Sequence, residues 1–152
     1  GGCGGGFGRR KTMVSVPGGF ACISAKVPFG VASFDHSGNL IWQKSVSPDI
    51  YPAKSLASTS SGLLLAGDTN TPGKASPGLR VVRTNSLGVV DWQQTYFFAK
   101  PTYLIVAKPI GPATVAVGQV LDPNVARVLY LGPDGAVAWD RVYPFPPDSA
   151  LR

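Results

Sequence analysis

A pattern that occurs three times along the chain constrains its fold more than any other feature. Each occurrence is a glycine followed, four residues later, by a tryptophan. The pairs are Gly38 and Trp42, Gly88 and Trp92, and Gly135 and Trp139. The tryptophans are 50 and 47 residues apart (42 to 92 and 92 to 139), and the chain has no others. Repeats of this length are typical of propeller-type architectures, so we expect three similar units.

Three extended segments precede each glycine–tryptophan pair. The first lies at 13–16, 54–58 and 103–108, the second at 19–25, 62–67 and 113–118, and the third at 30–35, 79–84 and 125–131. The glycine then forms a turn into a fourth strand that carries the tryptophan. Alternation along this strand predicts a shared face, with its members being Leu40, Trp42, Lys44 and Val46, then Val90, Trp92, Gln94 and Tyr96, then Val137, Trp139, Arg141 and Tyr143.

Composition supports a β-rich chain. Glycine (19) and proline (14) together make 33 of the 152 residues, and all eight acidic residues are Asp. Prolines interrupt long helices, and a protein with surface helices would normally use Glu. We therefore predict an all-β fold of antiparallel four-stranded blades, three blades of a β-propeller. The expected units are a Gly-rich basic leader at 1–11, blades at 12–47, 48–97 and 98–144, and a tail or the start of a further blade at 145–152.

The same segments resemble a family of bacterial cell-surface β-propeller repeats, written roughly as Gly-Gly-Tyr-x-Val-Ala-Gly and then Asp-x-x-Gly-x-x-x-Trp. The matches are Gly18-Gly19-Phe20, Leu65-Ala66-Gly67, Asp35 to Trp42, and Asp134 to Trp139. The second unit departs from the pattern, with Asn85 at the start of its turn. The resemblance implies the propeller fold and an extracytoplasmic location, because family members are often secreted or lipoproteins. It says almost nothing about activity.

Three blades do not close a ring, since closed propellers have four to eight. An open stack would expose an apolar face at each end. We therefore expect a protein partner: further blades or copies of the chain itself. Three arrangements meet this expectation, namely a fragment of a longer propeller, a half-propeller closed by dimerisation, and a subunit stacked in a larger assembly.

The sequence contains few residues suited to catalysis, so we predict no enzyme activity and no cofactor. The single histidine, His36, lies in the turn that begins at Asp35, where Asp and Ser are favoured because they hydrogen-bond nearby backbone. No Gly-x-Ser-x-Gly sequence occurs. Calcium at the loops of Asp35, Asp68 or Asp134 is an alternative, but the spacing fits no known metal motif, and we predict no metal site.

Two interpretations of Trp42, Trp92 and Trp139 are open. In the first they pack adjacent blades, and Gly38, Gly88 and Gly135 form the turns between strands. In the second each indole stacks on a sugar, as in a lectin. The function we predict is a non-catalytic structural or protein-binding module; the alternatives are carbohydrate binding and a fragment of a propeller enzyme whose site lies elsewhere. The loops at 68–77 and 121–124 are candidate contact surfaces.

The charge of +6 does not predict nucleic-acid binding. Four of the fourteen cations, Arg9, Arg10, Lys11 and Arg152, lie at the ends of the chain, and the rest nearly balance the eight acids. Cys22 lies in an apolar run and is expected to be buried. Cys3 lies in a Gly-rich segment, which is either the lipid anchor of a lipoprotein or a plain flexible leader. No stretch approaches the ~18 apolar residues that span a bilayer.

Overall fold

The computed structural model describes residues 13–24, 30–46, 53–69, 78–121 and 124–144. Within these ranges the chain forms twelve strands in three four-stranded antiparallel sheets and has no helix. The first sheet holds β1 (Met13–Val16), β2 (Gly19–Ser24), β3 (Gly30–Asp35) and β4 (Leu40–Ser45). The second holds β5 (Ser55–Ser58), β6 (Gly62–Thr69), β7 (Gly78–Asn85) and β8 (Val90–Tyr96). The third holds β9 (Thr102–Ile110), β10 (Ala113–Leu121), β11 (Asn124–Leu131) and β12 (Val137–Pro144). The predicted all-β class and the four strands of each repeat are confirmed.

Each sheet is a simple meander, in which strands that follow one another in the sequence are also neighbours in space. The turn between the third and fourth strands has the same geometry in all three sheets. Its glycine has a positive φ (Gly38 +85°, Gly88 +79°, Gly135 +85°), and the amide of that glycine donates to the carbonyl three residues earlier. Residues with a Cβ rarely adopt this conformation, which explains why glycine recurs at the position.

A β-bulge follows this turn in every sheet, and the face predicted for the start of the fourth strand is wrong because of it. The register shifts between Ser33 and Phe34, between Arg83 and Thr84, and between Tyr130 and Leu131. The extra residue turns the first residue of the strand to the opposite face from the tryptophan. In the second sheet, Val90 packs toward the first sheet and Trp92 toward the third. By the same register, Leu40 and Val137 do not share a face with their tryptophans.

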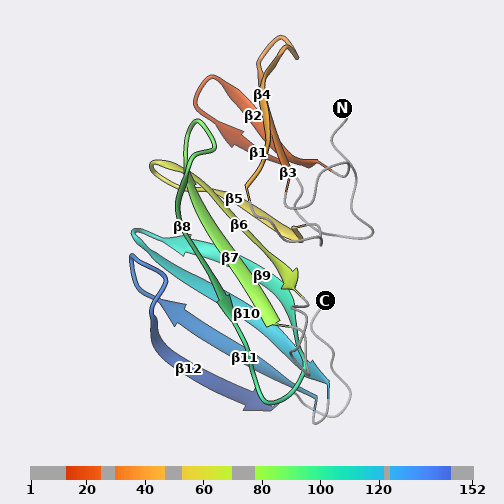
Figure 1. Ribbon diagram of the computed structural model, residues 1–152, viewed down its shortest axis with the longest axis vertical. Helices are drawn as coiled ribbons and strands as arrows, with labels where there is room; N and C mark the ends of the chain where they lie inside the picture. Colours follow the sequence, from red (N-terminus) through yellow and green to blue (C-terminus); the bar gives the residue numbers. More distant parts are fainter. Residues whose placement is uncertain (1–12, 25–29, 47–52, 70–77, 122–123, 145–152) are drawn as a thin grey trace.

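The three sheets stack face to face in chain order. In Figure 1 they follow one another down the view, from β1–β4 in red and orange through β5–β8 in yellow and green to β9–β12 in cyan and blue. One apolar core lies between the first and second sheets, and another lies between the second and third. The first strands are in contact along the stack, because β1 contacts β5 and β5 contacts β9.

The second sheet is covered on both faces, by the first sheet and by the third. The third sheet is covered by described strands on one face, and no described strand lies on its other face. In β6, Leu63 and Leu65 belong to the core with the first sheet, and Leu64 belongs to the core with the third. All three leucines are at most 2% exposed, and burial of each stabilises the fold by roughly 1.5–3 kcal/mol. In β10, by contrast, Val115 and Val117 are only half-buried on either side of the fully buried Ala116. This alternation shows that one face of the third sheet is not covered by any described strand.

Candidate functional site

Each pair of adjacent sheets is joined by the tryptophan of one sheet and the turn glycine of the next; we call this contact a joint. A Cβ added to Gly88 would lie 2.9 Å from both Cη2 and Cζ3 of Trp42. A Cβ added to Gly135 would lie 2.6 Å from Cζ3 and 2.7 Å from Cε3 of Trp92. Ordinary carbon contacts are about 3.5–4.0 Å. The indole therefore lies directly on the glycine backbone, and both glycines are buried.

Side chains two and four residues after the tryptophan add hydrogen bonds to the joints. In the first joint, Nζ of Lys44 donates to the carbonyl of Leu87 at 2.6 Å, so the exposed lysine is bonded to the next sheet. In the second joint, the hydroxyl of Tyr96 donates to the carbonyl of Gly135. Burial raises the pKa of Tyr96 well above its usual value near 10, and the negative charge of Asp134 raises it further.

The second joint has one additional contact, made by the cross-strand partner of Trp92. Arg83 donates through Nη2 to the carbonyl of Gly111 at 2.9 Å and through Nη1 to the carbonyl of Pro112. These two acceptors lie in the turn between β9 and β10, so Arg83 connects the second sheet to the third. Partial burial lowers the pKa of Arg83, and the charge of Asp91 opposes that effect.

A groove lies beside each joint. The first groove has a volume of about 440 Å³ and includes Trp42, Ser33 and Leu87. The second has a volume of about 340 Å³ and includes Trp92 and Arg83. The turn at 59–61, which is Thr-Ser-Ser, lines both grooves. Each groove therefore places a partly buried indole beside several hydroxyl groups.

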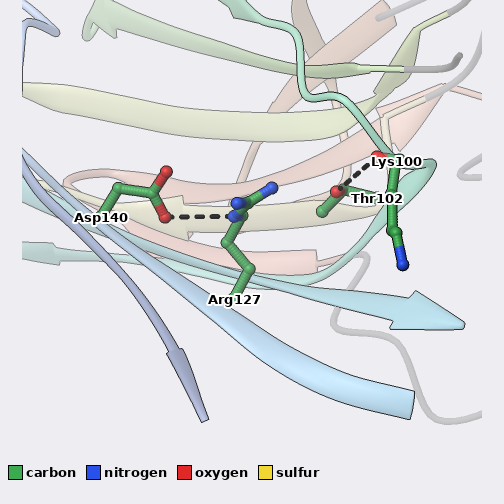
Figure 2. Close-up of polar contacts among 4 residues, drawn as sticks. All are labelled: Lys100, Thr102, Arg127 and Asp140. Atoms are coloured by element: carbon green, nitrogen blue, oxygen red, sulfur yellow. Dashed lines mark hydrogen bonds and ion pairs between the residues drawn. The ribbon is translucent and has the colours of Figure 1, made fainter. Parts of the chain in front are cut away.

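An arginine on β11 contacts the connection between β8 and β9. Nε of Arg127 lies 3.1 Å from Oδ1 of Asp140, and the guanidinium lies 4.4 Å from the centre of the Phe98 ring. Figure 2 shows this ion pair together with the buried Thr102, whose hydroxyl donates to the carbonyl of Lys100 at 3.2 Å. These contacts hold the connection between β8 and β9 against the third sheet.

The third tryptophan has the surroundings of a joint but no turn against it among the described residues. Trp139 stacks on Tyr130 within its own sheet, with ring centroids 5.5 Å apart, and the guanidinium of Arg141 lies 5.1 Å from the indole centroid. The strand register places the neighbouring apolar side chains on the same face. We call this surface the open face; it consists of Val115, Val117, Val128, Tyr130, Trp139, Arg141 and Tyr143.

The acidic residues considered as metal ligands are occupied by local interactions. Oδ1 of Asp35 accepts hydrogen bonds from the amides of Ser37 (2.9 Å) and Asn39 (2.8 Å), and Asp134 accepts one from the amide of Ala136. The side chain and backbone of Asn39 contribute most to lowering the pKa of Asp35. His36 is exposed beside Asp35.

Asp68 is also occupied, because it forms an ion pair with Lys54 and accepts a hydrogen bond from the amide of Leu104 at 2.6 Å. It therefore connects β6 of the second sheet to β9 of the third. Across the described ranges, no three His, Cys, Asp or Glu side chains lie close enough together to hold a metal.

Several of the predicted residues lie outside the described part of the chain. These are Cys3, the basic leader with Arg9, Arg10 and Lys11, the segments 70–77 and 122–123 of the candidate loops, and the tail at 145–152. Cys22 is fully buried, as predicted, and is not a free thiol. No helix in the described ranges is long and apolar enough to cross a membrane.

Sequence reasoning did not find Arg83 or Tyr96 as joint residues. Tyr96 carried a weak signal, because it lies four residues after Trp92 on the predicted shared face. Arg83 carried none, since its counterparts opposite the other tryptophans are Ser33 and Tyr130. Comparison with known proteins adds no guidance here: no family model and no curated protein matches the chain.

Proposed function

We propose that the chain is a non-catalytic, β-propeller-like scaffold whose open face binds another protein. The order of strands supports the propeller arrangement. The first strands β1, β5 and β9 contact one another along the stack, as the inner strands of propeller blades do, and each fourth strand lies at the outer edge of its sheet.

One observation carries the proposed binding function. On one face of the second sheet, Trp92 and Tyr96 lie four residues apart on β8, with Gln94 between them on the same face. That face is covered by the third sheet. The third sheet has Trp139, Arg141 and Tyr143 at the same positions, and Tyr143 is 46% exposed. A partly exposed apolar face with the composition of a buried one marks a protein interface.

The test is to place a charge in the centre of the open face and follow self-association. Val117→Glu puts a carboxylate among half-buried valines without touching either core. We expect the wild-type chain to associate in sedimentation velocity runs between 1 and about 100 µM, and the V117E variant to stay at 15.8 kDa with an unchanged β-sheet circular dichroism spectrum. Thr59→Glu, on a turn remote from the open face, serves as the matched control. A wild-type chain that stays monomeric throughout this range would contradict the proposed function.

A second candidate function, carbohydrate binding, is favoured by the two grooves. Indole faces stack on sugars and hydroxyls bind them, and the groove at Trp42 places Ser33, Thr59 and Ser61 around the ring. Ser60 is exposed and lines both grooves. Ser60→Tyr would therefore fill both without disturbing a joint. Glycan-array binding by the wild-type chain that is lost in S60Y would support this function, and the absence of wild-type binding would exclude it for the glycans on the array.

An extracytoplasmic location and lipidation at Cys3 are separate parts of the proposal. The location rests on the resemblance and suits a chain whose Cys22 is not a free thiol, whereas lipidation requires that Cys3, the only other cysteine in the sequence, has a free thiol. Metabolic labelling with a radioactive fatty acid in a bacterial host would test them, with Cys3→Ser as the control. Label that is present in the wild-type chain and absent from C3S would identify the lipid anchor. Equal absence from both would leave the interpretation of a plain flexible leader.

A further inference from the structure

The first sheet carries the half of a joint that the open face lacks. Gly38 has the same backbone conformation as Gly88 and Gly135, with φ of +85°. Those two glycines are buried under indoles, whereas Gly38 is exposed and a Cβ added to it would meet no atom within 4 Å. Within the described ranges, Gly38 is thus a turn glycine without an indole on it, and Trp139 is an indole without a turn on it.

We propose that a second copy of this chain binds the open face, with its Gly38 turn lying on Trp139. This inference rests on the proposed function and names its partner. The contact is head-to-tail, because it joins the third sheet of one copy to the first sheet of the other. It reproduces, between chains, the joint that the structure shows twice within one chain.

The polar groups on the two surfaces match. Lys44 donates to the carbonyl of Leu87, the residue before its turn glycine, so Arg141 in the same strand position meets the carbonyl of Ser37. Tyr143 takes the place of Tyr96 and donates to the carbonyl of Gly38. The half-buried Asp35 lies in the same turn, and hydrogen bonds from Asn39 lower the pKa of its carboxylate, so it is negatively charged opposite Arg141.

The apolar groups match as well. On the face of the first sheet that points away from the second, Cys22 and Ala32 are buried, and the outer part is accessible. There Phe34 is half-buried and Leu40 is 53% exposed. Leu40 has the register position of Val90, which packs into the core between the first and second sheets. In the proposed joint, Leu40 makes the corresponding contact with the open face.

Two copies related by a two-fold axis would form two such joints at once. The resulting ring has six sheets, which lies within the four to eight of closed propellers. A head-to-tail contact that closes in this way stops at a defined size and does not continue into filaments. The expected mass is that of two chains of 15.8 kDa, or 31.6 kDa.

The experiment uses two variants that each damage one half of the joint. Trp139→Ala removes the indole from the open face. Gly38→Asn adds a side chain to the turn at a φ that asparagine tolerates better than other residues with a Cβ. Gly18→Asn is the matched control, since Gly18 has φ of +83°, also has no atom within 4 Å of an added Cβ, and lies in a different turn.

We expect W139A and G38N each to sediment mainly as 15.8 kDa monomers at 20 µM, and the wild-type chain and G18N as dimers. Mixing equal amounts of W139A and G38N restores one intact joint, between Gly38 of the first variant and Trp139 of the second. The mixture should therefore form a one-to-one heterodimer, with affinity at least ten times that of either variant alone.

The outcomes separate this inference from the proposed function. If V117E abolishes association but G38N associates like the wild-type chain, the open face binds protein, but the proposed contact between Trp139 of one copy and Gly38 of another is wrong. If the mixture of W139A and G38N stays monomeric while the wild-type chain is a dimer, the head-to-tail arrangement is also overturned. Folding is monitored in every sample by circular dichroism, and a variant that loses its β spectrum is replaced by Arg141→Glu, which acts on the same face.

Discussion

Replacing the turn glycines by alanine tests whether the joints hold the sheets together. Gly135→Ala and Gly18→Ala change backbones with nearly the same φ, +85° and +83°. They differ in what the new methyl group meets. At Gly135 the Cβ lies 2.6 Å from Cζ3 of Trp92 and 2.9 Å from Cγ of Gln94, and at Gly18 it meets nothing within 4 Å. The difference between the two variants therefore isolates the contact between sheets.

The expected magnitudes follow from these distances. A left-handed conformation at a residue with a Cβ costs about 1–2 kcal/mol, and both variants incur this cost. Overpacking a close contact adds about 1–3 kcal/mol, which only Gly135→Ala incurs, because the Trp92 ring must move by roughly 1 Å to reach an ordinary carbon separation. We expect G135A to lower the free energy of unfolding by about 2–5 kcal/mol and G18A by about 1–2 kcal/mol.

Urea unfolding followed by tryptophan fluorescence measures both values, at 1 µM protein so that association does not contribute. With a slope of about 2 kcal/mol per molar urea, a difference of 2 kcal/mol moves the midpoint by about 1 M. Gly88→Ala should fall between the two, because its Cβ would lie 2.9 Å from Trp42 and the other neighbour is the flexible Lys44 stem at 3.3 Å. Equal midpoints for G135A and G18A would refute the indole-on-glycine joint.

Three further perturbations have expected outcomes. Tyr96→Phe removes the hydrogen bond to Gly135 and should lower the unfolding free energy by about 1 kcal/mol at neutral pH. Because the pKa of Tyr96 is raised in the folded state, the wild-type chain should lose stability as pH rises above about 10. The Phe variant should lose less stability over that pH range, and urea midpoints measured against pH would show the difference. Because the pKa of Asp35 is lowered in the folded state, its carboxylate stabilises the wild-type protein at neutral pH, and this stabilisation is lost as pH falls below 3.8. The Asp35→Ala variant should lack this acid-dependent loss of stability, and identical acid unfolding curves for the two proteins would contradict the prediction. Leu64 is buried between the second and third sheets, so Leu64→Ala should lower the unfolding free energy by about 2–5 kcal/mol. Val115 has the matching position on the open face, so Val115→Ala should lower it by less than about 1 kcal/mol in the dilute monomer. Differential scanning calorimetry would measure both changes.

The strands and their order could be predicted because the repeat shows three independent versions of one unit. Where one version was ambiguous, the others resolved it. The apolar run of β6, Leu63 to Ala66, illustrates this, since a short apolar run alone fits a buried helix as well as a strand. Its alignment with the alternating run of β10 favours a strand. The structure explains the difference between the two runs by the number of faces that are covered.

The bulge after each turn could not be predicted, for a physical reason. The extra residues are Ile41, Asp91 and Ala138, which lie between the two paired positions of each fourth strand. An aliphatic, an acidic and a small residue have no side-chain property in common, so no pattern marks the site. The bulge is a property of the backbone, where the strand bends out of the tight turn. The contacts of Arg83 were equally hidden, because they depend on how the third sheet is placed against the second.

The joints combine a constant part with a variable part, and the proposed contact of the open face with a partner depends on this division. In both joints the indole lies on the glycine backbone, and this contact would accept any turn of the same shape. The hydrogen bonds differ: the first joint uses Lys44 and the carbonyl before the glycine, and the second uses Tyr96 and the carbonyl of the glycine itself. The open face has a long cation and a phenol, Arg141 and Tyr143, at these two positions. Burying an unpaired donor destabilises a complex. In the proposed complex, the open face therefore prefers a turn that offers the carbonyl of the glycine and the carbonyl of the residue before it, and an entirely apolar surface would bind less well. A turn of that kind is exposed at Gly38.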